Sequence, residues 1–244
     1  LISIHHTHTL ARAPQTHTYT ANRFTAISHK IFAIIDIPGA AHESCNLNYR
    51  IDKRRWKLPI VFHNLRGYDG HLLISAAKKR HGRIRVIPNN MERYTSFSIG
   101  RVQFIDSFQF TMQSLEKLVK TLDDDDCRHT RKAFKNEEEF HLMRRKGVFP
   151  YDFFDSVEIL TSPELPSREA FYNTLQGEEC TVEDYIHAKT VWRSFNCTSF
   201  RQYHDLYLKS DVLLLADFFE KFRRMCMSSY GLDAAHYHTS PGKF

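Results

Sequence analysis

The sequence lacks the features of membrane and secreted proteins. It has no run of about 18 apolar residues, the length that a helix needs to cross a bilayer, and its first residues, LISIHHTHTL, do not form a secretory signal. Its five cysteines are odd in number and scattered, and none belongs to a CxxC pair. This pattern argues against a disulfide framework. We therefore expect an intracellular protein with reduced thiols and without a membrane partner.

Acidic residues are scarce in one part of the chain. The net charge is +6 and the isoelectric point is near 9.0. Residues 50–101 are rich in arginine and lysine but hold only three acids, Asp52, Asp69 and Glu92. A polyanionic partner such as DNA would suit this charge. A solvated basic face is the alternative that charge alone leaves open.

Residues 1–37 show neither a strand period nor a helix period, and we expect them to be disordered. Strands are predicted at 58–63, 84–88, 94–100 and 101–108, with a hairpin turn near Gly100. Helices are predicted after Gly70, over 112–122, after the N-cap Thr181, and from 200 to the stop at Gly231. Residues 123–140 are predicted to be a loop, and 162–177 a loop that leads into a helix. This mixture indicates an α/β or α+β fold.

Two acids could carry chemistry. Asp69 follows a predicted buried strand and stands beside Gly70, and Asp211 lies four residues after Tyr207 on the long predicted helix, so that the two side chains share a face. A carboxylate among so many apolar residues must be solvated, paired or bound to a metal. Taken singly, Asp69 is equally explained as a capping residue and Asp211 as a partly exposed helix acid.

The order of these motifs is more specific than each alone. N-x-x-x-Y-D, at Asn64, Tyr68 and Asp69, followed by Y-x-x-x-D, at Tyr207 and Asp211, resembles the second and third exonuclease motifs of family B DNA polymerases, with the spacing of the protein-primed branch. Three longer stretches are similar to the polymerases of Polinton/Maverick-type mobile elements, namely AAHESCNLNYR, RRKGVFPYDFFDS and YGLDAAHYHTSPG. The resemblance runs from about Pro38 to Gly242.

The resemblance implies a ribonuclease-H-like 3′–5′ exonuclease domain of the α/β class over residues 38–244. It implies two metal ions, Mg²⁺ or Mn²⁺, held by Asp69 and Asp211, since carboxylates are the ligands that these ions prefer. Tyr207 would orient the attacking water. Asn64 and Tyr68 would contact the single-stranded 3′ end of DNA, with the aromatic ring offering a stacking face.

Two further motifs match more loosely. Ser114-Leu115, in SLEKL, fits a pattern with which protein-primed polymerases bind single strands, and an amphipathic helix that packs on the core is the alternative. Lys146, in KGVF, resembles a lysine that neutralises phosphate charge during exonuclease chemistry, and an ordinary basic loop is its alternative.

The sequence also departs from the family pattern. The first exonuclease motif, D-x-E, is expected on a strand before residue 58, where the nearest match places Pro38 after Asp36. We therefore expect the sheet to be incomplete at its N-terminal strands and the metal ligand set to be incomplete. His42 and Cys45 resemble half of a zinc site, the basis of a third hypothesis, a zinc-dependent endonuclease. The family's polymerase palm would follow the final SPGKF, so no nucleotide addition is expected from this chain.

The sequence thus predicts the exonuclease and single-strand-binding region of a protein-primed DNA polymerase that replicates a mobile element. A terminal protein primer is a possible partner, and the nucleus a possible location if the element is host-encoded. The main alternative is a catalytically dead nucleic-acid-binding module that keeps the cleft without the chemistry.

Overall fold

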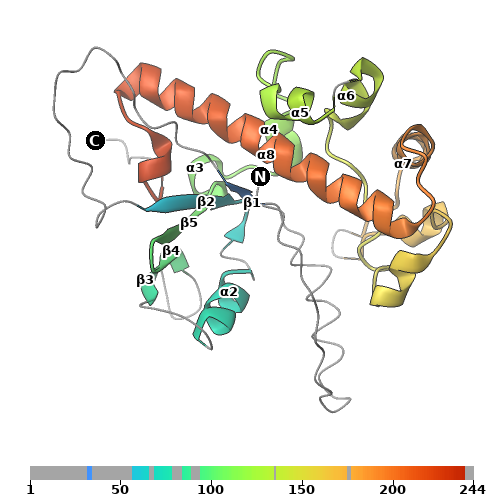
Figure 1. The fold of residues 1–244 in the computed structure, drawn as a ribbon, viewed down its shortest axis with the longest axis horizontal. Helices are drawn as coiled ribbons and strands as arrows, with labels where there is room; N and C mark the ends of the chain where they lie inside the picture. The colour runs from blue at the N-terminus through green and yellow to red at the C-terminus, as the bar shows by residue number, and fades with distance from the viewer. Residues whose placement is uncertain are drawn as a thin grey trace. The chain divides into compact units, whose positions relative to one another are not determined.

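The computed structural model describes residues 32–34, 57–65, 69–78, 84–88, 94–134, 136–174 and 177–239. The chain divides into two compact units. Within the described residues, unit 1 comprises 32–113 and 219–239, and unit 2 comprises 114–218. Figure 1 shows the elements of each unit.

Unit 1 is built on a five-stranded mixed sheet of order β1-β2-β5-β4-β3. Its strands are β1 (Phe32–Ile34), β2 (Leu58–Phe62), β3 (Ile84–Pro88), β4 (Tyr94–Ile99) and β5 (Val102–Asp106). Only β2 and β5 run parallel, and the other neighbours are antiparallel. The predicted hairpin turn is confirmed, because Gly100 links β4 to β5 with φ +59°, a conformation that glycine adopts at little cost.

The strand β1 falls inside the segment that the sequence left unpatterned. It pairs antiparallel with β2 along the edge where we expected the sheet to be incomplete. In the opposite direction the sheet ends at β3, whose residues after Ile84 are exposed.

Neighbouring residues of a strand point to opposite sides of the sheet, so both faces carry apolar side chains that can pack. Each face is covered by helical residues of unit 1. On one face, Phe62 and Phe104 pack with Ile74 of α2 (Asp69–Lys78). On the other, Val61 and Ile105 pack with side chains of α8 (Phe200–Tyr230) and of the 3₁₀ helix η5 (Ala234–His236), namely Phe219, Cys226, Ala234 and Ala235. Unit 1 also includes the short α3 (Phe108–Thr111). It is thus a small layered α/β structure, as the mixed pattern of strands and helices predicted.

Unit 2 consists of helices and loops. Its elements are α4 (Leu115–Val119), α5 (Arg128–Ala133), α6 (Glu137–Met143), η3 (Val157–Thr161), η4 (Arg168–Phe171), α7 (Val182–Ser194) and the first part of α8 (Phe200–Tyr230). The predicted cap of α7 is confirmed, because the Thr181 hydroxyl accepts a hydrogen bond from the backbone N–H of Asp184 at 3.1 Å.

The prediction of a loop over 123–140 is wrong, since this stretch contains α5 and the start of α6. The side chain of Asn136 caps α6 by accepting from the backbone N–H of Glu138, and the acids of the first turn suit the positive end of the helix dipole. The predicted helix over 112–122 is shorter than expected, and the described residues of 162–177 contain the brief 3₁₀ helix η4.

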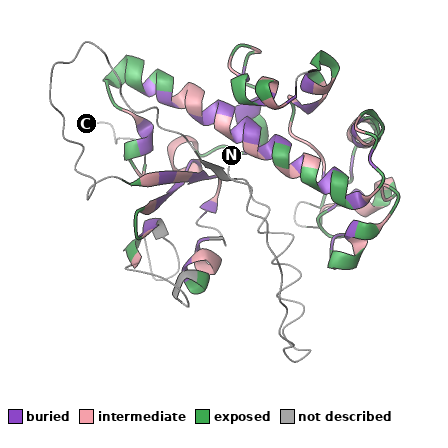
Figure 2. Cartoon of the chain, viewed as in Figure 1, coloured by how far each residue is buried: buried purple, intermediate pink, exposed green. Residues whose placement is uncertain are grey.

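The long helix α8 confirms the prediction over 200–230. Figure 2 shows buried and exposed residues interleaved along it, as expected for a helix with one apolar stripe. It ends at Gly231, which has φ +67° and so fits a helix stop. Within the described ranges, no helix is long and apolar enough to cross a membrane, and Cys127, Cys180, Cys197 and Cys226 are free and buried.

Candidate functional site

The predicted site residues fall into two groups, one in each unit. Unit 2 holds Ser114, Leu115, Lys146, Tyr207 and Asp211. Unit 1 holds Asn64 and Asp69, and Tyr68 lies between them outside the described residues. Each group is described by itself, and the predicted meeting of Asp69 with Asp211 stays a prediction.

In unit 2, Lys146 joins the two predicted residues of α8. Its ammonium group donates to the hydroxyl of Tyr207 at 2.8 Å and to Oδ2 of Asp211 at 2.8 Å. Tyr207 and Asp211 are brought to one cation because they are one helical turn apart. The Asp211 side chain is only 2% exposed, whereas that of Lys146 is 27% exposed. The pair therefore consists of an inner carboxylate and an outer ammonium group.

One carboxylate oxygen of Asp211 has no hydrogen-bond partner among the residues that the structure describes. This atom, Oδ1, is buried. Leaving a buried carboxylate oxygen unpaired is costly, so native proteins rarely keep one without a ligand, water or ion. Oδ1 is therefore a chemically suitable donor for a divalent cation.

The lysine and its surroundings shape the electrostatics. Burial lowers the pKa of Lys146, but the charge and hydrogen bond of Asp211, together with Tyr151 and Glu116, outweigh burial, and the pKa lies above its ordinary value of 10.5. Burial, and then the charge of Asp211, raise the pKa of Tyr207 well above 10. At neutral pH the site thus contains an ammonium group and a phenol whose proton is held.

Aromatic packing fixes the ring of Tyr207. Phe149 stacks on it with ring centroids 5.0 Å apart, and Tyr151 meets it edge to face. The hydroxyls of Tyr151 and Tyr207 also share a hydrogen bond. The Tyr151 side chain completes a chain of polar contacts that runs from Asp211 through Lys146 and Tyr207.

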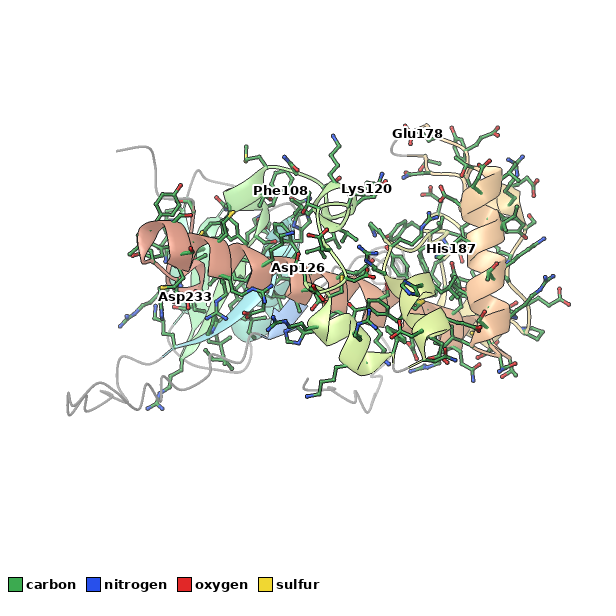
Figure 3. All side chains as sticks on the ribbon, turned by 90° about the horizontal axis from the view of Figure 1, so that it is seen from above. Phe108, Lys120, Asp126, Glu178, His187 and Asp233 are labelled. Atoms are coloured by element: carbon green, nitrogen blue, oxygen red, sulfur yellow. The ribbon has the colours of Figure 1, made fainter. Side chains whose placement is uncertain are left out.

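Unit 2 contains a groove of about 930 Å³, which is lined in part by Lys146, Phe149, Tyr151 and Tyr207. Four of the five predicted residues of this unit, Ser114, Leu115, Lys146 and Tyr207, line the groove. Lys120 and Glu178, labelled in Figure 3, belong to the same lining. Ser114 also caps α4, because its hydroxyl accepts from the backbone N–H of Lys117 at 3.4 Å, and Leu115 is buried against Leu214 and Leu215. The packing role proposed as their alternative is therefore real for Leu115.

Charges of both signs line this groove, so it is not simply basic. Lys120 pairs with Glu116, and Arg145 with Asp184. These pairs are exposed enough to contribute little to stability, and their cations can exchange a carboxylate partner for a phosphate at little cost.

In unit 1, Asn64 follows β2 and adopts a left-handed backbone conformation with φ 63°. Its N–H donates to Oδ1 of Asp106, the last residue of β5, at 2.8 Å. Asp69 is the first residue of α2, and its side chain lies outside the described residues, as does all of Tyr68. Asp36, His42 and Cys45 also lie outside them.

The sequence analysis gave no role to three residues near the predicted positions, namely Gly147, Tyr151 and Asp106. Gly147 and Tyr151 follow Lys146 in KGVFPY, and Asp106 interrupts the apolar run VQFID. An acid that ends a buried strand was the signal used for Asp69, and the same signal applies to Asp106.

The described residues contain no group of three or more histidine, cysteine or acidic side chains that could hold a metal ion. Of the two predicted metal ligands, Asp69 and Asp211, the structure describes the side chain of Asp211. Its Oδ1 atom is buried and has no hydrogen-bond partner among the described residues. Among the described side chains, Asp211 therefore offers one oxygen that fits the chemistry of a metal ligand.

The chain was compared with known proteins. Residues 54–243 match the family model described as DNA polymerase type B, organellar and viral. No curated protein matches, and no solved structure matches. The matched range covers most of the sequence, including both groups of site residues. The chain therefore belongs to the family of type B DNA polymerases of the organellar and viral kind.

Proposed function

We propose that this chain forms the 3′–5′ exonuclease and single-strand-binding region of a protein-primed DNA polymerase that replicates a mobile element. Membership of a DNA polymerase family makes DNA a partner, and polymerases of this family generally use divalent metal ions. The finer proposal rests on the order of the motifs, and the mixed sheet of unit 1 is compatible with the α/β fold that it requires. It adds a terminal protein primer as a candidate partner and the nucleus as a candidate location.

The arrangement of Lys146, Tyr207 and Asp211 is the observation that carries this proposal. A lysine that donates at 2.8 Å both to a buried carboxylate and to a phenol, beside a groove, is suited to phosphate chemistry. The ammonium group can neutralise charge on a phosphate that enters the groove. Burial keeps the pKa of Tyr207 high, so its hydroxyl retains a proton that can orient a water molecule.

Asp211 would hold a divalent ion, Mg²⁺ or Mn²⁺, through its unsatisfied Oδ1, with Asp69 as the second carboxylate. When bound, such ions activate water and stabilise the leaving oxygen of a phosphodiester. The role of the chain is to place these carboxylates, to keep Lys146 at Oδ2 of Asp211, and to receive the DNA strand. Asn64 and Tyr68 in unit 1, and Ser114 and Leu115 in unit 2, are the proposed contacts to that strand.

The test is digestion of 3′-labelled single-stranded DNA in the presence of Mg²⁺ or Mn²⁺. Only weak shortening of the labelled strand is expected for the wild type, because the sequence lacks the D-x-E motif, and this shortening should disappear in Asp211→Ala and Asp69→Ala. Asp205→Ala is the matched control, because Asp205 lies on the same helix with a side chain that is 58% exposed. Shortening that survives in Asp211→Ala would refute the proposed role of Asp211.

A second function is favoured by one observation. Lys146 already occupies Oδ2 of Asp211, so that Oδ1 is the one oxygen of this carboxylate left for a metal ion. A catalytically dead module that binds single-stranded DNA would have this property. Binding of the oligonucleotide without shortening, together with no change of the thermal midpoint on addition of Mn²⁺, would favour this alternative.

A further inference from the structure

We propose that Asp106 is a positioning residue for DNA recognition, whose carboxylate holds Asn64 in the backbone conformation needed to contact the strand. This inference rests on the proposed function, because it assigns to Asn64 the role of a single-strand contact. It concerns a residue that the motif comparison does not include.

The carboxylate of Asp106 is buried, with 1% exposure, at the end of β5. Its Oδ1 atom accepts the N–H of Asn64 at 2.8 Å and the N–H of Phe108 at 3.1 Å. Hydrogen bonds to an ionised acceptor are stronger than those between neutral groups. One oxygen therefore ties the segment after β2 to the segment after β5.

The conformation of Asn64 explains why such a tie is needed. With φ 63° it lies in the left-handed region, which side chains other than glycine adopt at a cost and which asparagine tolerates better than most. An unfavourable backbone conformation persists only where the surroundings impose it. The hydrogen bond from the Asn64 N–H to Asp106 is the contact that holds this residue in that conformation.

Ser107 supplies a second tie at the same point. Its N–H and its hydroxyl both donate to the carbonyl oxygen of Phe62, at 2.8 and 2.9 Å, and its hydroxyl lies 2.9 Å from Nδ1 of His63. Phe62 and Asp106 are partners in the parallel register of β2 and β5. The two strands are thus joined at their carboxyl ends, the edge at which α/β sheets bind ligands.

A positioning role for Asp106 and a merely structural role predict different combined effects of the Asp106 and Asn64 variants on DNA affinity. If Asp106 acts through Asn64, then removing the Asp106 carboxylate should abolish the benefit of the Asn64 side chain. If Asp106 only stabilises the fold, then its loss and the loss of the Asn64 side chain should weaken binding independently.

The experiment is a double-mutant cycle with Asp106→Ala, Asn64→Ala and the double variant. Affinity for a fluorescein-labelled oligo(dT) is measured by anisotropy in EDTA, on samples whose folding is checked by circular dichroism. Each single variant should bind about tenfold more weakly, and the double variant no more weakly than either. Asp106→Asn, which keeps an acceptor oxygen, should retain more affinity than Asp106→Ala.

Asp217→Asn is the matched control. Asp217 is a fully buried carboxylate of unit 2 that accepts the backbone N–H groups of His129 and Thr130 at 2.7 and 3.0 Å. It resembles Asp106 in chemistry, but its hydrogen bonds go to the start of α5 and not to Asn64, so affinity should change by no more than about twofold.

Multiplicative losses in the double variant, or an equal loss in Asp217→Asn, would overturn the positioning role. Where Asp106→Ala does not fold, the cycle of Asp106→Asn with Asn64→Ala decides by the same criterion. A wild type that fails to bind the oligonucleotide would overturn the proposed function and this inference together. Wild-type binding with multiplicative losses overturns the inference alone.

Discussion

Gly147 lies so close to Tyr207 that a Cβ atom at position 147 would stand 2.9 Å from Cδ2 and 3.4 Å from Cε2 of the ring. The ring has little freedom to retreat, because Phe149 stacks on it at 5.0 Å and its hydroxyl bonds to Lys146 and Tyr151. Because Gly147 has no side chain, the backbone beside Lys146 can pack closely against the ring of Tyr207.

Replacing Gly147 by alanine should displace the Tyr207 ring. We expect the free energy of unfolding to fall by about 1–3 kcal/mol, the usual cost of adding a methyl group to a packed site. Exonuclease activity should fall as well, because the Tyr207 hydroxyl moves from Lys146. Urea unfolding and digestion of labelled single-stranded DNA measure the two effects.

Gly177→Ala provides the comparison for Gly147→Ala. A Cβ atom at position 177 would meet no heavy atom within 4 Å, so this variant carries only the strain of its φ of +68°. It should cost stability without affecting digestion. Equal losses of digestion in the two variants would show that the Tyr207 contact is unimportant.

Lys146→Met should destabilise the protein by removing the cation beside a buried carboxylate. Breaking a buried ion pair from one side costs roughly 3–5 kcal/mol, and the partial exposure of Lys146 places the expected loss near or below the lower limit. Urea unfolding at pH 7 gives the value. Because the raised pKa of Lys146 exceeds 10.5, the stabilisation by this pair should persist from neutral pH to about pH 10 and decline as the pH rises through the pKa of the folded state.

The double variant Lys146→Met/Asp211→Asn separates charge from packing. With the carboxylate neutralised, less of the penalty remains, so the double variant should be more stable than Lys146→Met alone. A double variant that is less stable than either single variant, by the sum of their losses, would mean that the two side chains do not interact.

Much of the fold could be predicted because local patterns determine it. The helix α8 has a long apolar stripe and ends at Gly231, and the capping by Thr181 can be read directly from TVED. The helix α5 could not be predicted locally. Its first N–H groups are satisfied by Asp217, which lies 88 residues from His129 in the sequence.

The candidate site was predictable only in part for a similar reason. Tyr207 and Asp211 lie one turn apart on a single helix, so their spacing places them together. The arrival of Lys146 at both depends on contacts over 61 and 65 residues, which the motif resemblance indicated and the periodicity did not. The contact of Gly147 with Tyr207 and that of Asp106 with Asn64 arise from packing that no short motif encodes.

His187 should make the stability of the protein depend on pH. Burial, and then the charge of Arg145, lower the pKa of His187 from 6.5 to about 4. Between these values the unfolded chain binds more protons than the folded one, so stability is lost as the pH falls from 6.5 towards 4, by at most about 1.4 kcal/mol per pH unit. Stability measured by urea unfolding should therefore fall less steeply over this range in His187→Gln than in the wild type. Identical slopes would show that His187 titrates normally in the folded protein.

Arg223 and Asp233 form an ion pair whose contribution to stability should also be lost as the pH falls, but in a more acidic range than that of His187. Nε and Nη2 of Arg223 donate to the two oxygens of Asp233 at 2.8 and 2.6 Å, and the side chains are only 10% and 14% exposed. Arg223→Met should cost roughly 3–5 kcal/mol at pH 7, because it leaves a buried carboxylate without its cation. Arg223→Lys should recover only part of this, since an ammonium group cannot reproduce the two-pronged contact.

The pH dependence of this loss follows from the pKa of Asp233. Burial alone would raise that pKa, but the hydrogen bonds from Arg223 and from the backbone N–H of Ala235, together with the charge of Arg223, outweigh burial and hold it below 3.8. A lowered pKa means that the stabilisation is complete above 3.8 and is lost as the pH falls through the value of the folded state. The difference in unfolding free energy between the wild type and Arg223→Met should therefore be smaller at pH 3 than at pH 7. An equal difference at both would mean that Arg223 acts through the packing of its side chain rather than through charge.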